Sequence, residues 1–236
     1  NCDIDANNRF YASFSIAQKE PTRNNYTDGN ADEYPKAEKL LDYELGYTYR
    51  NTWLSAGANF YYMDYKDQLV LTGELNEIGE AMARNVPDSY RMGVELMLGV
   101  KPCQWFQWDI NGTLSKNRVK NFTEKLYEDE WKNPVEVSHG NTPIAFSPDL
   151  ILNNRFSFSY RGFEAALQSQ YVSKQYMSNA RQADQTLNAY FVSNLNLAYT
   201  FKLPHVKSVT AGFTIYNLFN AEYENNGYAG SGYKIV

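Results

Sequence analysis

The stretch that decides the fold is Tyr90–Asn117, which reads YRMGVELMLGVKPCQWFQWDINGTLSKN. Apolar side chains occupy alternate positions in both halves, namely Met92, Val94, Leu96, Leu98 and Val100, then Phe106, Trp108, Ile110 and Leu114. Alternation with a period of two indicates a β-strand with one apolar and one polar face. The two runs are joined by a short turn, so they predict a hairpin. Strands of about 9–11 tilted residues are long enough to cross a bilayer core.

The same alternation recurs along most of the chain. Its further runs are Arg9–Ala17, Asp42–Arg50, Leu54–Tyr65, Leu150–Tyr160, Phe163–Ser173, Tyr190–Phe201 and Val209–Ile215. The connections between runs alternate strictly between short and long. The short ones include Arg50–Thr52, Arg161–Gly162 and Lys202–Lys207, and the long ones are Gln18–Leu40, Lys66–Ser89, Arg118–Pro148 and Lys174–Asn188. Within the second long connection, Gln68–Thr72 is expected to extend a strand and Asn76–Ala83 to form a short helical turn.

These lengths favour an all-β fold, an antiparallel up-and-down transmembrane β-barrel segment of about nine to ten strands. Soluble domains rarely contain repeated long loops without structure, whereas outer-membrane barrels combine short periplasmic turns with long extracellular loops. The aromatic content of 16% suits the aromatic girdles of such a barrel. A soluble β-sandwich with its apolar faces inward is the alternative explanation of the alternation.

Composition excludes several other classes. No run of 18 apolar residues is present and the mean hydropathy is -0.58, so no transmembrane helix is expected. The net charge of -5, without any basic run, argues against nucleic acid as a partner. The first residues lack the apolar segment of a signal peptide. Cys2 and Cys103 are expected to be free thiols because several strands separate them in the predicted sheet.

No catalytic signature is present, so the protein is not expected to be an enzyme. His139 and His205 are read as solitary surface histidines, and Ser and Asp do not occur at motif spacing. The acidic residues Glu124 and Glu128–Glu130 lack the regular spacing of a calcium loop and are read as a solvated face. Neither a metal nor a cofactor is expected.

Several short motifs occur in a recognisable order. They are Pro21-Thr22, Glu38-Lys39, YELGY at 43–47, FYYMDYKDQ at 60–68, Asn85-Val86, RMGVE at 91–95, and YNLFN at 216–220 with Tyr223. This ordered set, which spans nearly the whole chain, resembles the C-terminal part of the barrel of TonB-dependent outer-membrane receptors. In style it also resembles proteins of the Bacteroidetes.

The resemblance implies a bacterial outer-membrane barrel of about 22 strands with an internal plug. It also implies active uptake of a scarce nutrient such as an iron chelate, haem, cobalamin or a glycan. The implied partners are outer-membrane lipid, the nutrient and a TonB complex, which supplies energy by gripping a box near the receptor's N-terminus. The plug, the TonB box, the first half of the barrel and the usual final strand are not in residues 1–236. The chain is therefore expected to be a piece whose sheet edges pair with strands elsewhere, because a bilayer does not tolerate unpaired edges.

Ligand capture is expected on the long loops and at the mouth of the barrel. Aromatic side chains there can stack on a sugar or a macrocycle, and arginines can contact an anionic ligand. The candidates are Tyr26, Tyr34, Arg84, Arg91, Tyr127, Trp131, Tyr176 and Tyr228. Loop packing is the alternative role for the aromatic residues, and pairing with Glu95 or Asp88 is the alternative for the arginines.

Two other functions stay open at this point. A passive porin-like or structural barrel would have the same strands but neither plug nor TonB box. A soluble β-rich carbohydrate-binding module would need no detergent.

Overall fold

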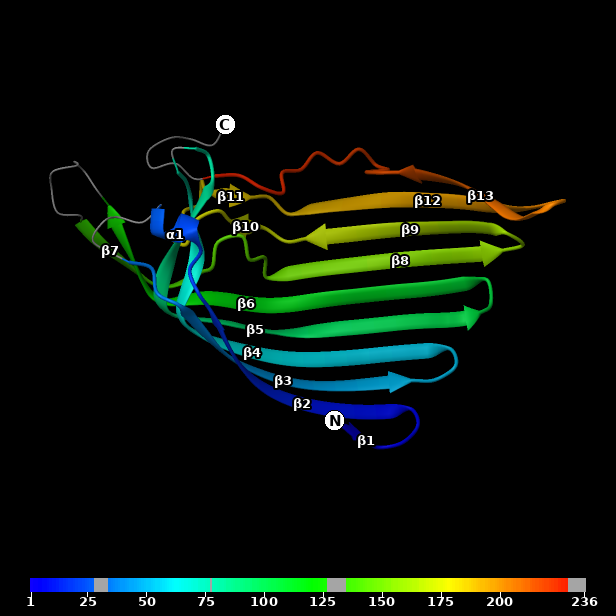
Figure 1. The fold of residues 1–236 in the computed structure, drawn as a ribbon, viewed down its shortest axis with the longest axis horizontal. Helices are drawn as coiled ribbons and strands as arrows, with labels where there is room; N and C mark the ends of the chain where they lie inside the picture. Colours follow the sequence, from blue (N-terminus) through cyan, green and yellow to red (C-terminus); the bar gives the residue numbers. More distant parts are fainter. Residues whose placement is uncertain (28–33, 77, 127–134, 229–236) are drawn as a thin grey trace.

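Nine antiparallel strands of ten or more residues form one curved sheet in the computed structural model, which describes residues 1–27, 34–76, 78–126 and 135–228 (Figure 1). The long strands are β2 (Asn8–Lys19), β3 (Glu38–Arg50), β4 (Leu54–Leu75), β5 (Ala81–Cys103), β6 (Phe106–Leu126), β8 (Leu150–Tyr160), β9 (Phe163–Val172), β12 (Tyr190–Leu203) and β13 (Val206–Ile215). The shorter elements are β1 (Cys2–Asp3), α1 (Arg23–Thr27), β7 (Val135–Pro143), β10 (Gln175–Tyr176) and β11 (Thr186–Leu187). The predicted strands and their number are confirmed.

Each long strand pairs with the next one in the chain, from β2 to β13, while β7 pairs with β6 beside this path. The β3–β4, β5–β6, β8–β9 and β12–β13 turns lie at one end of the sheet, and the other connections between the long strands lie at the opposite end, called the long-loop end (Figure 1). The described strands do not close into a ring, and β1 and β13 form the two outer edges of the sheet. No helix in the described part of the chain has the length and apolar character needed to span a membrane.

The apolar face of the sheet is solvent-exposed in the isolated chain, which excludes the sandwich alternative. Leu45 is 46% exposed, Leu96 57% and Leu114 63%. A sandwich would bury these side chains against a second sheet. The opposite face is polar, and Asp109, Arg155, Gln168 and Asn194 stand in one row across β6, β8, β9 and β12. An apolar outer face and a polar inner face are typical of a transmembrane barrel.

Two groups of aromatic rings border the apolar face. Toward the long-loop end, Phe14, Tyr43, Tyr62 and Tyr90 form a continuous row across β2–β5, with centroid separations of 4.9, 6.5 and 6.1 Å. At the short-turn end, Trp105 lies 6.1 Å from Phe158, and Trp53 is also exposed. Trp53 and Tyr62 are nine positions apart, which corresponds to ~23 Å along the barrel axis at ~3.3 Å per residue and a tilt of about 40°. This separation matches the ~25 Å apolar band of outer-membrane barrels.

The long connections contain more strand than the sequence predicts. Strands β4, β5 and β6 have 22, 23 and 21 residues, so they continue beyond the apolar band, and β7 folds back on β6. The extension of a strand through Gln68–Thr72 is confirmed. The helical turn predicted at Asn76–Ala83 is wrong, because Asn76 Oδ1 accepts the backbone N–H groups of Ile78 and Glu80 at 3.1 and 2.8 Å and closes a tight β4–β5 turn instead.

The buried core lies at the long-loop end and not between two layers. Val70, Val86, Val119 and Ile144 form one buried cluster with Phe122 packed against it. A second cluster joins Met177 and Leu187 to Phe146. The chain therefore buries its apolar side chains where the strands rise beyond the membrane band, and leaves those within the band for lipid.

The β8–β9 turn provides a test of the hairpin geometry. Arg161 and Gly162 have φ values of 50° and 86°, which a two-residue type I′ turn requires. We expect Gly162→Ala to lower the stability of the intact protein by about 2 kcal/mol, because alanine disfavours positive φ and its Cβ would lie 2.9 Å from the Thr200 carbonyl oxygen. Urea unfolding in detergent micelles measures this effect. Gly212→Ala is the control, since its Cβ would meet nothing closer than 3.8 Å, and an equal loss in both variants would contradict the prediction.

Candidate functional site at the mouth of the barrel

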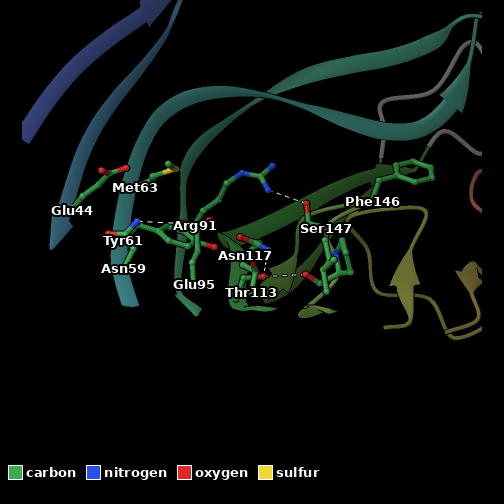
Figure 2. Close-up of a pocket in the computed structure, with 13 residues that line it drawn as sticks. Glu44, Asn59, Tyr61, Met63, Arg91, Glu95, Thr113, Asn117, Phe146 and Ser147 are labelled. Carbon is green, nitrogen blue, oxygen red and sulfur yellow. Dashed lines mark hydrogen bonds between the residues drawn. The ribbon is translucent and has the colours of Figure 1, made fainter. Parts of the chain in front are cut away.

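A cavity of about 340 Å³ lies on the polar face of the sheet, near the long-loop end. Its strand side is formed by alternate residues of β4, β5 and β6, whose side chains share one face. Its other side is formed by Phe146, Ser147 and Pro148, from the segment between β7 and β8 (Figure 2). The connection thus folds back over the inner face of the sheet and turns an open wall into a pocket.

Arg91 is the positively charged residue among those that line this pocket. Its side chain leaves β5 and extends toward the 144–148 segment, where Nη1 donates a hydrogen bond of 3.0 Å to Ser147 Oγ (Figure 2). The alternative pairing of Arg91 with Glu95 or Asp88 is not found within the described residues, where Asp88 forms an ion pair with Lys66 and Glu95 accepts a hydrogen bond from Asn59. The guanidinium therefore contacts a neutral hydroxyl and keeps donors for an anion.

Two carboxylates lie on the same wall. Glu44 of β3 and Glu95 of β5 line the cavity together with Asn59, whose Nδ2 lies 3.4 Å from Glu95 Oε2. Tyr61 stands between them and lies over Gly93, the residue directly opposite on β5. The pocket is therefore mixed in charge, with Arg91 nearer the long loops.

Asn179 connects the segments that cover the pocket through two side-chain hydrogen bonds. It is 3% exposed, its Oδ1 accepts the Ala145 N–H at 2.8 Å, and its Nδ2 donates to the Leu71 carbonyl at 2.8 Å. One side chain of the β9–β12 connection thus ties together the end of β4 and the 144–148 segment. The backbone N–H of Phe146 also donates to the Tyr176 carbonyl at 2.8 Å.

Tyr176 stands among cations on the same connection. A hydrogen bond with Arg181 lowers the pKa of the phenol, and nearby Lys174 lowers the pKa further. Lys174 Nζ lies 5.1 Å from the centre of the Tyr176 ring. This group places positive charge beside an aromatic ring at the long-loop end of the sheet.

Of the eight predicted ligand residues, Arg91 is the one that the described structure places in the pocket. Tyr26 on α1, Tyr34 and Tyr228 are exposed by 50%, 82% and 50%. Arg84 lies in the extended part of β5 and Tyr176 in β10. Tyr127 and Trp131 lie outside the described residues, as do Glu128–Glu130. A role in ligand binding stays a prediction for all eight.

His139 is not a solitary surface histidine. Its Nε2 lies 2.8 Å from Glu124 Oε2, and its ring packs against Phe122 at 6.0 Å. The prediction of a long loop over residues 118–148 missed this pair. In the structure β6 and β7 form an antiparallel ladder within that stretch and bring the two residues together. His205 has a φ of 69° in the predicted short turn between β12 and β13. Cys2 and Cys103 are free, as predicted.

Phe146, Ser147 and Asn179 are pocket or capping residues that the sequence did not reveal. They lie in stretches without periodicity, where no pattern reports which side chain turns inward.

Comparison with known proteins identifies the family. Residues 3–218 match the family described as "TonB dependent receptor-like, beta-barrel". The pesticin receptor of Yersinia enterocolitica (serotype O:8 / biotype 1B) is 25% identical over 196 residues, which cover 81% of this chain. Those residues are 26% of the receptor, so the chain spans about a quarter of this curated relative.

Solved structures agree on the fold. The ferric yersiniabactin uptake receptor FyuA from Yersinia pestis superposes with a TM-score of 0.70 at 19% identity, covering 98% of this chain and 33% of that one. The ferric-catecholate import receptor Fiu from E. coli K12 superposes with a TM-score of 0.67 at 16% identity, covering 99% and 31%. These relatives do not support the resemblance to Bacteroidetes proteins. The chain belongs to the family of TonB-dependent receptor β-barrels, which are proteins of the bacterial outer membrane.

Proposed function

We propose that this chain forms part of the wall and mouth of a receptor that takes up a ferric chelate across the outer membrane. Two similar structures are described as a ferric yersiniabactin uptake receptor and a ferric-catecholate import receptor. The same names make an iron chelate a better candidate than haem, cobalamin or a glycan, which the resemblance also allows.

The rest of the machinery is part of the proposal. Because the chain spans 26% of its curated relative, we propose that further strands pair with the edges at β1 and β13 and complete a barrel around a plug. A TonB complex would then supply the energy through a box outside residues 1–236. The observation that carries a binding role is the capped pocket, in which Arg91 offers donors to an anionic group.

Growth under iron limitation tests the proposal. A strain without the intact receptor is expected to stop growing when one ferric chelate is the sole iron source, and to grow again when the receptor is restored. Deletion of TonB should abolish growth even with the receptor present. Growth that needs the receptor but not TonB would support the passive-pore alternative, and growth on every chelate without the receptor would contradict the proposal.

Arg91 gives a residue-level prediction. We expect Arg91→Ala in the intact receptor to weaken binding of the transported chelate about tenfold, because a charge-assisted hydrogen bond contributes about 1.5 kcal/mol. Uptake of the iron-55 chelate at sub-saturating concentration measures the loss. Arg155→Ala is the matched control, since Arg155 lies on the same polar face nearer the short turns and donates to Ser157. Equal uptake by wild type and Arg91→Ala would remove Arg91 from the site.

A further inference from the structure

Two Asn-Gly dipeptides occur in this chain, and the fold places them in opposite settings. They are Asn111-Gly112, within β6, and Asn226-Gly227, in the segment that follows β13. This segment runs to the long-loop end of the sheet (Figure 1). Glycine has no Cβ, so the backbone nitrogen that follows each asparagine is open to the asparagine side chain. The same reactive dipeptide is thus present once in a strand and once outside any strand.

The reacting groups of the second dipeptide already touch. The backbone N–H of Gly227 donates a hydrogen bond of 2.9 Å to Asn226 Oδ1. Asn226 is exposed, so water and hydroxide reach its side-chain amide. Residues 224–228 belong to no helix or strand, and therefore no ladder restrains the rotation that brings the nitrogen from Oδ1 to the adjacent Cγ.

The first dipeptide is held by the sheet. Gly112 is paired on both sides, with Leu96 of β5 and Leu152 of β8. A residue between two antiparallel neighbours donates its N–H to one of them. The side chain of Asn111 is also held, because its Oδ1 accepts a hydrogen bond of 3.1 Å from Asn153 Nδ2. A reaction between Asn111 and the Gly112 nitrogen therefore requires local opening of the sheet.

Packing explains why glycine stands at position 227. A Cβ on Gly227 would lie 2.6 Å from Met177 Sδ and 3.5 Å from Leu187 Cδ2, so a larger residue would displace Met177. Met177 is 0% exposed and forms a buried cluster with Leu187, against which Phe146 packs. Phe146 also lines the pocket at the mouth of the barrel. The glycine that leaves Asn226 reactive is thus the residue that covers this cluster.

We propose that Asn226 is a deamidation site, at which the receptor acquires aspartate or isoaspartate as it ages. The Gly227 nitrogen gives up its proton and bonds to Asn226 Cγ, the Cγ–Nδ2 bond breaks, and ammonia leaves a succinimide ring. One water then opens the ring and returns a proton to the nitrogen. Cleavage of its bond to Cγ gives aspartate, and cleavage of its bond to the Asn226 carbonyl carbon gives isoaspartate. The reaction exchanges one ammonia for one water and needs neither an oxidant nor a cofactor.

The modification acts on the cover of the pocket. Isoaspartate adds one carbon to the main chain before Gly227, which moves Gly227 from its place against Met177. The backbone N–H groups of Phe146 and Met177 donate to the carbonyls of Tyr176 and Gln185 at 2.8 and 2.9 Å. We expect their exchange with solvent to accelerate about tenfold, which is part of what full exposure of a methionine side chain would give. This effect is independent of the transported nutrient.

Peptide mapping of the intact receptor, incubated in detergent at mildly alkaline pH, tests the proposal. Electron-transfer fragmentation locates the modified residue and distinguishes isoaspartate from aspartate. We expect Asn226 to convert at least about 100-fold faster than Asn111, because attack at Asn111 requires the sheet to open first. In urea-unfolded receptor the two dipeptides are expected to react at similar rates, since the protection of Asn111 comes from the fold.

Asn226→Gln is the matched variant, because glutamine must close a larger ring and does so much more slowly. It is expected to keep its amide, and its amide exchange at Phe146 and Met177 should not change during the incubation. Equal rates at Asn226 and Asn111 in the folded receptor would overturn the proposal. Conversion of Asn226 without faster exchange at Phe146 and Met177 would overturn the effect on the pocket. Iron-dependent growth is expected to persist in Asn226→Gln, so failure of this test and failure of the uptake test are distinguishable.

Discussion

Gly93→Ala is expected to lower the stability of the intact receptor by about 1–3 kcal/mol, the range of a forced overpacking. The new Cβ would lie 2.6 Å from the Leu114 carbonyl oxygen and 2.6 Å from Tyr61 Oη. The Tyr61 ring can turn away, but the Leu114 carbonyl belongs to the backbone of the adjacent strand. It can shift only by distorting the β5–β6 ladder.

The resistance of the folded barrel to SDS on heating measures this loss. Gly57→Ala is the matched control, because Gly57 lies on the same face of the adjacent strand β4, and its Cβ would meet the flexible end of Met97 at 3.2 Å. A Gly93→Ala receptor that unfolds at the same temperature as Gly57→Ala would show that the β5–β6 ladder is looser than described.

Asn179→Ala is expected to release the loops that cover the pocket. The variant removes the partners of the Ala145 N–H and the Leu71 carbonyl in one step. Two lost hydrogen bonds in a buried setting destabilise by about 2–3 kcal/mol, so amide exchange at residues 144–148 should accelerate about 30- to 150-fold if it proceeds by local opening.

Hydrogen exchange of the intact receptor, read by mass spectrometry, gives the result directly. Ser178→Ala is the control, since Ser178 is 8% exposed and its hydroxyl has no hydrogen-bond partner within the described residues. Unchanged exchange in Asn179→Ala would mean that the two hydrophobic clusters hold the loops without Asn179. A matching acceleration in Ser178→Ala would attribute the effect to general loosening of this loop.

The sequence by itself predicted the sheet, because every strand that crosses a membrane band must alternate between lipid and lumen. The hairpin Tyr90–Asn117, the Arg161–Gly162 turn and the apolar outer face all follow from local rules of period and turn geometry. Arg91 was also accessible, since its place on the polar side of β5 follows from the same alternation.

Tertiary structure decided how the long connections fold and therefore where the pocket lies. Asp67 in β4 has a φ of 50°. Before Asp67, the odd-numbered residues Tyr61 and Met63 face the pocket, whereas after it the even-numbered residues Gln68 and Val70 are buried. Such a change of face breaks the period on which sequence reading depends. Asn179, Phe146 and Ser147 reach the site from stretches without any period, so only long-range contacts with Leu71, Ala145 and Arg91 position them. Period-two alternation is a local property that lipid imposes on each strand, whereas capping depends on contacts between residues up to 108 positions apart.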